Sequence, residues 1–160
     1  MEETNNRDFR ILIVDDVPKN IQVLAGILKE EGYNVGFATT GKAALKHSVT
    51  TAYDIILLDI MLPDIEGFEV CRRLKENPET GEIPVIFITA KDSTEDKIRG
   101  FEQGAVDFIT KPFDSVEVLA RVRNHLALRS YASKLEMMVE ERTNQSFFPF
   151  GAGPLKAPFS

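Results

Sequence analysis

The sequence contains little of what disulfide-bonded, zinc-binding or membrane-inserted proteins need. It has one cysteine, Cys71, which excludes an internal disulfide framework and fits a reducing compartment, so we expect a cytoplasmic protein. Its only histidines, His47 and His125, are far apart in the sequence and far from any cysteine pair, which argues against a zinc site. No stretch approaches the ~20 apolar residues of a membrane span, and the amino terminus lacks the apolar segment of a signal peptide.

A net positive charge is also absent. The formal net charge is −6, so neither duplex DNA nor an anionic membrane is an expected partner. The turn after the first apolar run reads Asp15-Asp16-Val17-Pro18 and contains no glycine-rich phosphate cradle. Its acids would repel phosphates that arrive without a metal ion. A nucleotide-binding domain is therefore disfavoured.

Short apolar runs are the main positive signal. Four of them end at polar residues: residues 11–14 precede Asp15, 55–58 precede Asp59, 85–88 precede Thr89, and 106–110 precede Lys111. Continuous runs of this kind suit parallel strands that are covered on both faces. A shorter strand is expected at 34–38, and helical patterns alternate with the strands at 19–31, 41–49, 68–75, 94–103 and from Asp114 onward. This order predicts an α/β fold, a doubly wound, flavodoxin-like parallel sheet of five strands flanked by five helices, with the last helix extended.

The polar residues that end these runs predict one site, because ligands of such sheets bind at the carboxyl ends of the strands. Asp59 can be the nucleophile that takes up a phosphoryl group. Asp16 and Asp59 can ligate Mg²⁺ or Mn²⁺ directly, with Asp15 holding the ion through water. Lys111 and Thr89 can bind the phosphoryl oxygens. The backbone carbonyl of Met61 can supply a further oxygen to the ion, since no side chain is needed there.

These residues resemble the receiver domain of two-component response regulators over about residues 8–128. The matching motifs, each weak alone and strong in order, are Asp15-Asp16, Leu58-Asp59-Ile60-Met61-Leu62-Pro63 with Gly67, Thr89-Ala90 and Lys111-Pro112-Phe113. The resemblance implies a signalling domain and not an enzyme. It implies that a histidine kinase transfers phosphate to Asp59 with magnesium bound by Asp15, Asp16 and Asp59. It also implies a cis peptide bond before Pro112.

The resemblance further assigns a switch pair and two tuning positions. Thr89 and Phe108 correspond to the switch residues; phenylalanine keeps the aromatic ring but has no hydroxyl group where the family often has tyrosine. We expect Phe108 to be half-buried, since a switch needs two positions for the ring. Met61 and Lys91 occupy the positions that flank the phosphoryl group and tune its lifetime in this family.

The pattern beyond the receiver-like region predicts a helical linker. We assign residues 1–8 to an N-terminal tail, 9–128 to the receiver domain, 129–143 to the linker, and 144–160 to a tail that is disordered or was introduced by cloning. Four- and three-residue steps predict a coiled-coil seam, although a solvated helix with incidental apolar residues is the alternative; the seam comprises Leu128, Ala132, Leu135 and Val139. A homodimer through this helix and the face of the fourth helix, fifth strand and fifth helix would signal to an output domain that these residues do not contain.

Two other classes of protein remain as alternatives. Some magnesium-dependent phosphohydrolases also use an aspartate nucleophile with a threonine and a lysine on a doubly wound sheet. They need a second carboxylate two residues after the nucleophile, and this sequence has Met61 there. A scaffold that merely dimerises through its last helix is the other alternative.

Overall fold

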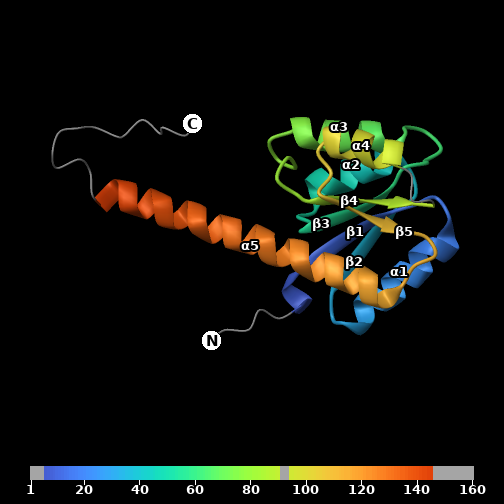
Figure 1. Ribbon diagram of the computed structural model, residues 1–160, viewed down its shortest axis with the longest axis horizontal. Helices are drawn as coiled ribbons and strands as arrows, with labels where there is room; N and C mark the ends of the chain where they lie inside the picture. The colour runs from blue at the N-terminus through green and yellow to red at the C-terminus, as the bar shows by residue number, and fades with distance from the viewer. Residues whose placement is uncertain (1–5, 91–93, 146–160) are drawn as a thin grey trace. The chain divides into compact units, whose positions relative to one another are not determined.

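The computed structural model describes residues 6–90 and 94–145, with side chains described as far as residue 139 (Figure 1). Its parallel sheet has the strand order β2-β1-β3-β4-β5. The strands are β1 (Arg10–Val14), β2 (Asn34–Ala38), β3 (Ile55–Asp59), β4 (Val85–Thr89) and β5 (Asp107–Thr110). The helices are α1 (Pro18–Glu30), α2 (Gly41–Thr50), α3 (Gly67–Glu76), α4 (Thr94–Glu102) and α5 (Ser115–Gln145). The predicted doubly wound α/β fold is confirmed.

The chain divides into two compact units, one ending at Leu126 and one beginning at Ala127. The first unit contains the sheet, α1 to α4 and the first part of α5. The second contains the continuation of α5. Among the described residues, no helix is long and apolar enough to cross a membrane.

Helices cover both faces of the sheet within the first unit (Figure 1). Residues of α1 and α5 pack with one set of strand side chains, including Ile13 and Leu57. Residues of α2 and α3 pack with the opposite set, including Leu12 and Phe87. Every residue of β3 and β4 is buried, which explains why their sequences are continuous apolar runs and not alternating ones.

The strand register brings the predicted site residues to one edge of the sheet. Val14 pairs with Leu58, so the residues that follow them, Asp15 and Asp59, lie at the same level. Thr89 pairs with Thr110, and the backbone N–H of Lys111 donates to the carbonyl of Thr89 at 2.8 Å. The carboxyl edge of the sheet therefore carries two of the acids, the hydroxyl group and the ammonium group.

Several boundaries differ from the sequence-based expectations. Residues 6–8, expected in a polar tail, form a 3-10 helix, and Asn6 donates from Nδ2 to the carbonyl of Glu31 at 2.7 Å. The fifth strand begins at Asp107, one residue later than expected, and Val106 before it is exposed. Helix α5 continues to Gln145, two residues beyond the expected linker, while residues 146–160 lie outside the described residues. The expected cis peptide bond between Lys111 and Pro112 is present.

An aromatic column lies under α4 and depends on a glycine. The ring centroids of Phe87 and Phe108 are 5.8 Å apart, and those of Phe108 and Phe101 are 5.1 Å apart. A Cβ atom added at Gly100 would lie 2.6 Å from Cζ of Phe108 and 3.0 Å from Cδ2 of Phe87. Helix α4 can therefore approach the column this closely only with glycine at position 100.

We predict that Gly100→Ala destabilises the fold by about 1–2 kcal/mol, because overpacking against two rings outweighs the better helix propensity of alanine. Gly26→Ala is the matched control: a Cβ atom there, in the exposed part of α1, meets nothing within 4 Å. It should stabilise by about 0.5–1 kcal/mol. Urea denaturation of both variants measures the difference, and equal stability of the two would contradict the tight contact.

Candidate functional site

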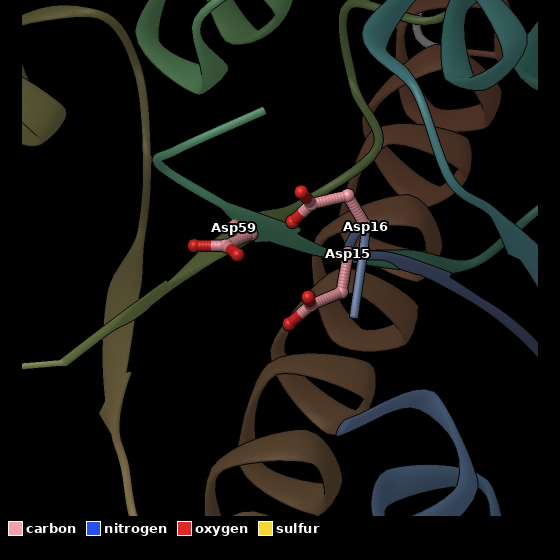
Figure 2. Close-up of side chains that lie close together, drawn as sticks. All are labelled: Asp15, Asp16 and Asp59. Atoms are coloured by element: carbon pink, nitrogen blue, oxygen red, sulfur yellow. The ribbon is translucent and has the colours of Figure 1, made fainter. Parts of the chain in front are cut away.

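Three carboxylates meet where β1 and β3 end. Asp15 and Asp16 directly follow β1, and Asp59 is the last residue of β3. One oxygen from each carboxylate lies within 4.8 Å of the others. Figure 2 shows the three side chains gathered at this edge of the sheet. Asp15 and Asp59 are buried, whereas Asp16 is exposed.

The two buried acids are held by different partners. Asp15 accepts hydrogen bonds from the backbone N–H of Val17 at 2.9 Å and from Nδ2 of Asn20 at 3.1 Å. Asp59 accepts one from the backbone N–H of Met61 at 3.3 Å. The ammonium group of Lys111 lies between them, 3.5 Å from Oδ2 of Asp59 and 3.8 Å from Oδ2 of Asp15. One ammonium group thus faces two buried carboxylates, with a third nearby.

This arrangement disfavours the charged form of Asp59. Burial and the neighbouring charge of Asp15 raise the pKa of Asp59 to about 6, against the opposing effects of Lys111 and the Met61 N–H. The cluster offers only oxygen donors, and its three carboxylates outnumber the ammonium groups that face them among the described residues, where Lys111 alone does so. Both properties suit a hard divalent cation such as Mg²⁺, whose charge would relieve the repulsion.

An open pocket of about 560 Å³ extends from the acid cluster toward α4. Five of the residues predicted for the site line it: Asp16, Asp59, Met61, Thr89 and Lys111. Asp15 is fully buried and does not line it. Lys91, predicted to tune the phosphoryl lifetime, lies outside the described residues.

The seam residues belong to α5, where Leu128, Leu135 and Val139 are exposed.

The expectation that Phe108 is half-buried is wrong. Its side chain is only 5% exposed, because the ring is enclosed between Phe87 and Phe101 and is covered by Gly100. Thr89 is equally buried, at 4%. In this state the ring is therefore fully inside, and any change of its position requires α4 to repack.

Two residues that line the pocket, Glu66 and Arg99, were not predicted, because no motif in the sequence indicates them. They come from separate segments, and Arg99 Nη2 lies 2.5 Å from Glu66 Oε1. Asp64, in the same loop as Met61, was also missed. It accepts hydrogen bonds from the backbone N–H groups of Gly41 and Lys42 at 2.8 and 2.9 Å, which fixes the loop to the start of α2.

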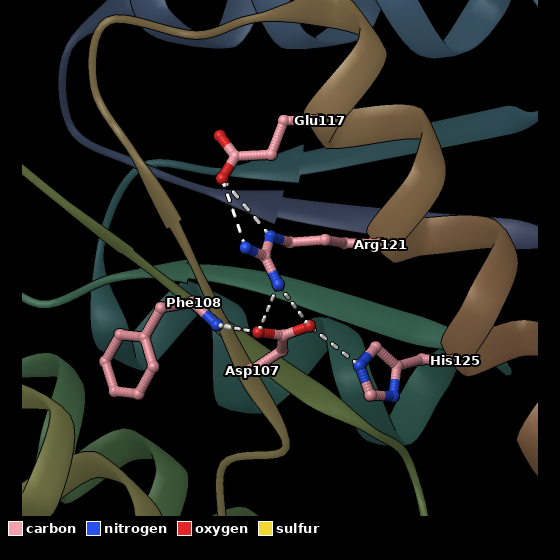
Figure 3. Close-up of polar contacts among 5 residues, drawn as sticks. All are labelled: Asp107, Phe108, Glu117, Arg121 and His125. Atoms are coloured by element: carbon pink, nitrogen blue, oxygen red, sulfur yellow. Dashed lines mark hydrogen bonds and ion pairs between the residues drawn. The ribbon is translucent and has the colours of Figure 1, made fainter.

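A further polar network, shown in Figure 3, lies next to Phe108. Asp107 accepts hydrogen bonds from Nη1 of Arg121 at 2.7 and 2.9 Å, and its Oδ2 lies 3.0 Å from Nε2 of His125. Arg121 also pairs with Glu117 at 3.3 Å. The four-residue spacing of Glu117, Arg121 and His125 would have placed them on one helix face, but nothing in the sequence indicated Asp107 as their partner.

Comparison with known proteins defines the class of this site. The family model of the response regulator receiver domain matches residues 11–123. The chain belongs to this family of phosphorylation-dependent signalling domains, as its motifs predicted.

Individual relatives agree with this assignment. The chain is 50% identical over 115 residues to the response regulator PleD of Caulobacter vibrioides, covering 72% of this chain and 25% of PleD. A response regulator structure from Chloroflexus aurantiacus has a TM-score of 0.73 at 37% identity, covering 74% of this chain and 98% of that one. The receiver domain of a sensor histidine kinase from Pseudomonas aeruginosa, with a magnesium ion coordinated in its active site cleft, has a TM-score of 0.70 at 28% identity and the coverages 74% and 98%. The chain therefore spans about a quarter of the length of PleD.

We predict that Asp59→Asn stabilises the metal-free protein above pH 6. Because the pKa of Asp59 is raised on folding, the folded state loses stability as pH rises from about 4 to the folded value of about 6. The uncharged amide of the Asp59→Asn variant avoids this loss. The free energy of unfolding of the variant should therefore exceed that of wild type by on the order of 1–3 kcal/mol at pH 8 and by little at pH 4.

Thermal denaturation across this pH range, in buffer containing a chelator, measures the effect. Asp8→Asn, which removes the same charge from an exposed position outside the site, should change little. A difference between Asp59→Asn and wild type that is constant with pH would contradict the account.

Proposed function

We propose that Asp59 is the phosphoacceptor of this receiver domain and takes its phosphoryl group from a phosphohistidine of a histidine kinase. The observation that carries the proposal is the convergence of Asp15, Asp16 and Asp59 with Lys111 at one edge of the sheet. An oxygen of Asp59 attacks phosphorus as the bond to the donor breaks. Lys111 and Thr89 bind the phosphoryl oxygens.

We assign the cation site to the same cluster, with Mg²⁺ or Mn²⁺ as the ion. Asp16 and Asp59 are the direct ligands, Asp15 acts through water, and the backbone carbonyl of Met61 completes the protein ligands. The bound ion would neutralise charge on the transferring phosphoryl group. The magnesium ion in the related Pseudomonas aeruginosa receiver domain supports this assignment.

The phosphohydrolase alternative has less support. Its acid–base carboxylate would occupy position 61, where the thioether of Met61 is 75% exposed at the pocket and cannot transfer protons. In the receiver domain, this position and Lys91 instead tune the lifetime of the phosphoryl group.

The packing around Phe108 supports a route for the signal. We propose that phosphorylation draws Thr89 and Phe108 inward, and that the ring of Phe108 and α4 repack together because Gly100 rests on the ring. Helix α4 carries two exposed apolar side chains, Ile98 and Phe101, and the ring of Phe101 contacts Phe108 of β5. We propose that the face of α4, β5 and α5 and the seam of α5 form a homodimer that acts, in the cytoplasm, on an output domain that these residues do not contain.

Phosphorylation by acetyl phosphate with magnesium should add one phosphate per chain, as intact mass measures. Asp59→Asn should abolish the addition, because among the described residues Asp59 is the carboxylate that both pairs with Lys111 and lines the pocket, whereas Asp15 is fully buried. Asp16→Asn should weaken magnesium binding by at least about tenfold and more than Asp15→Asn, since Asp16 is a direct ligand. Undiminished labelling of Asp59→Asn would disprove the assignment of the phosphoacceptor.

Beryllofluoride, which mimics a phosphoryl group on aspartate, should shift a monomer–dimer equilibrium toward the dimer. The two predicted heptads of the seam associate weakly alone, so the receiver face must add to them. Leu135→Glu with Val139→Glu should abolish the shift, whereas Met137→Glu, at an exposed position off the seam, should not. Sedimentation at several concentrations decides this; identical distributions with and without beryllofluoride would refute the dimer.

A further inference from the structure

Arg99 is a charged group of the pocket that the proposed phosphotransfer does not use. Its Nη2 lies 2.5 Å from Oε1 of Glu66, and its guanidinium carbon lies 4.2 Å from the centre of the Phe68 ring. Glu66 is the N-cap residue of α3, yet its side chain makes no capping hydrogen bond to that helix. The bridge therefore connects the start of α3 to α4 at the pocket.

The charges of the residues that line the pocket make Arg99 a candidate binding group for an anion. Among the described residues that line it, the acids outnumber the cations: Asp16, Asp59, Glu66 and Asp96 against Lys111 and Arg99. Lys111 is already within 3.8 Å of two carboxylates. Arg99, by contrast, has no described contact with the acid cluster. It can therefore bind the part of a phosphodonor that lies away from Asp59.

The position of Arg99 is fixed from both sides. Phe68, buried beneath the guanidinium, packs against Phe87 with ring centroids 5.2 Å apart. Gly100, the next residue of α4, rests against Phe87 and Phe108. About half of the Arg99 side chain remains exposed, at 52%. A guanidinium carries five N–H donors in one plane, and the bond to Glu66 is made by one terminal nitrogen.

We propose that Arg99 is a donor-selecting residue that binds the carboxylate leaving group of acyl phosphates. This inference rests on the proposed role of Asp59 as phosphoacceptor. A guanidinium matches the two oxygens of a carboxylate, and the match strengthens as negative charge develops on the leaving group. Glu66 competes for Arg99 and lowers its availability to the donor.

The chemistry distinguishes two classes of small phosphodonor. With acetyl phosphate, an Asp59 oxygen forms a bond to phosphorus while the bond from phosphorus to the acyl oxygen breaks. The electron pair stays on that oxygen, and acetate leaves as an anion without needing a proton. Phosphoramidate reacts in its N-protonated form: an Asp59 oxygen bonds to phosphorus, the phosphorus–nitrogen bond breaks with its electron pair on nitrogen, and neutral ammonia leaves. Arg99 stabilises the first leaving group and has no matching charge to stabilise in the second.

The test compares phosphorylation rate constants for acetyl phosphate and phosphoramidate, measured on the full chain with magnesium. The ratio of the two constants should fall about three- to tenfold in Arg99→Gln, as expected for loss of a half-exposed charge-assisted contact. Glu66→Gln should raise the ratio, because it frees Arg99. The double variant, whose net charge equals that of wild type, should keep the low ratio.

Arg73→Gln is the matched control, since Arg73 is similarly exposed at 48%, pairs with Glu69 on α3 and does not line the pocket. Its ratio should equal that of wild type, and unchanged melting temperatures exclude misfolding. Two results overturn the inference: an equal loss with both donors in Arg99→Gln, or a fall of the ratio in Glu66→Gln, which would make the bridge itself the functional element. If the wild-type protein accepts phosphate from neither donor, the proposed function fails instead.

Discussion

The repulsion among three carboxylates is the constraint on which the site depends. Strands β1 and β3 place Asp15 and Asp59 side by side because their apolar residues are buried against helices on both faces of the sheet. The backbone cannot relax to separate them without exposing that core. Burial of Asp59 and the neighbouring charge of Asp15 raise the pKa of Asp59, and among the described residues Lys111 alone opposes them with an ammonium group. The stability of the fold thus maintains a site that favours a divalent cation.

On the side of the pocket away from the acids, α4 connects the pocket to the aromatic column and to the surface. Helix α4 rests on Phe108 through Gly100, and the same helix carries Arg99 to the pocket and Phe101 to the surface. A change in the position of Phe108 would therefore reach the pocket rim and an exposed apolar side chain of α4. In the proposed function, the carboxyl edge of the sheet performs the phosphotransfer and the α4 side communicates its result.

Strand ends could be predicted from the sequence because a buried parallel strand is a continuous apolar run and its end is marked by the first polar residue. Asp15, Asp59, Thr89 and Lys111 were found this way. The pairing of Glu66 with Arg99 could not be predicted, because the two residues are 33 positions apart and their side chains meet only after α3 and α4 have packed. The partners of Asp107 could not be predicted for a similar reason, since Arg121 and His125 come from α5 and meet it only in the packed fold. The burial of Phe108 depends on Gly100, whose role is visible only in the packed helix.

The most direct test of the central claim is the melting temperature of the wild-type protein as magnesium is added at pH 8. If the three carboxylates form a cation site strained by their own charges, the melting temperature should rise with magnesium and saturate, because the ion binds only the folded state. Asp59→Asn should begin at a higher melting temperature and gain less. A wild-type melting temperature that does not respond to magnesium, while calcium and sodium are equally without effect, would contradict the account.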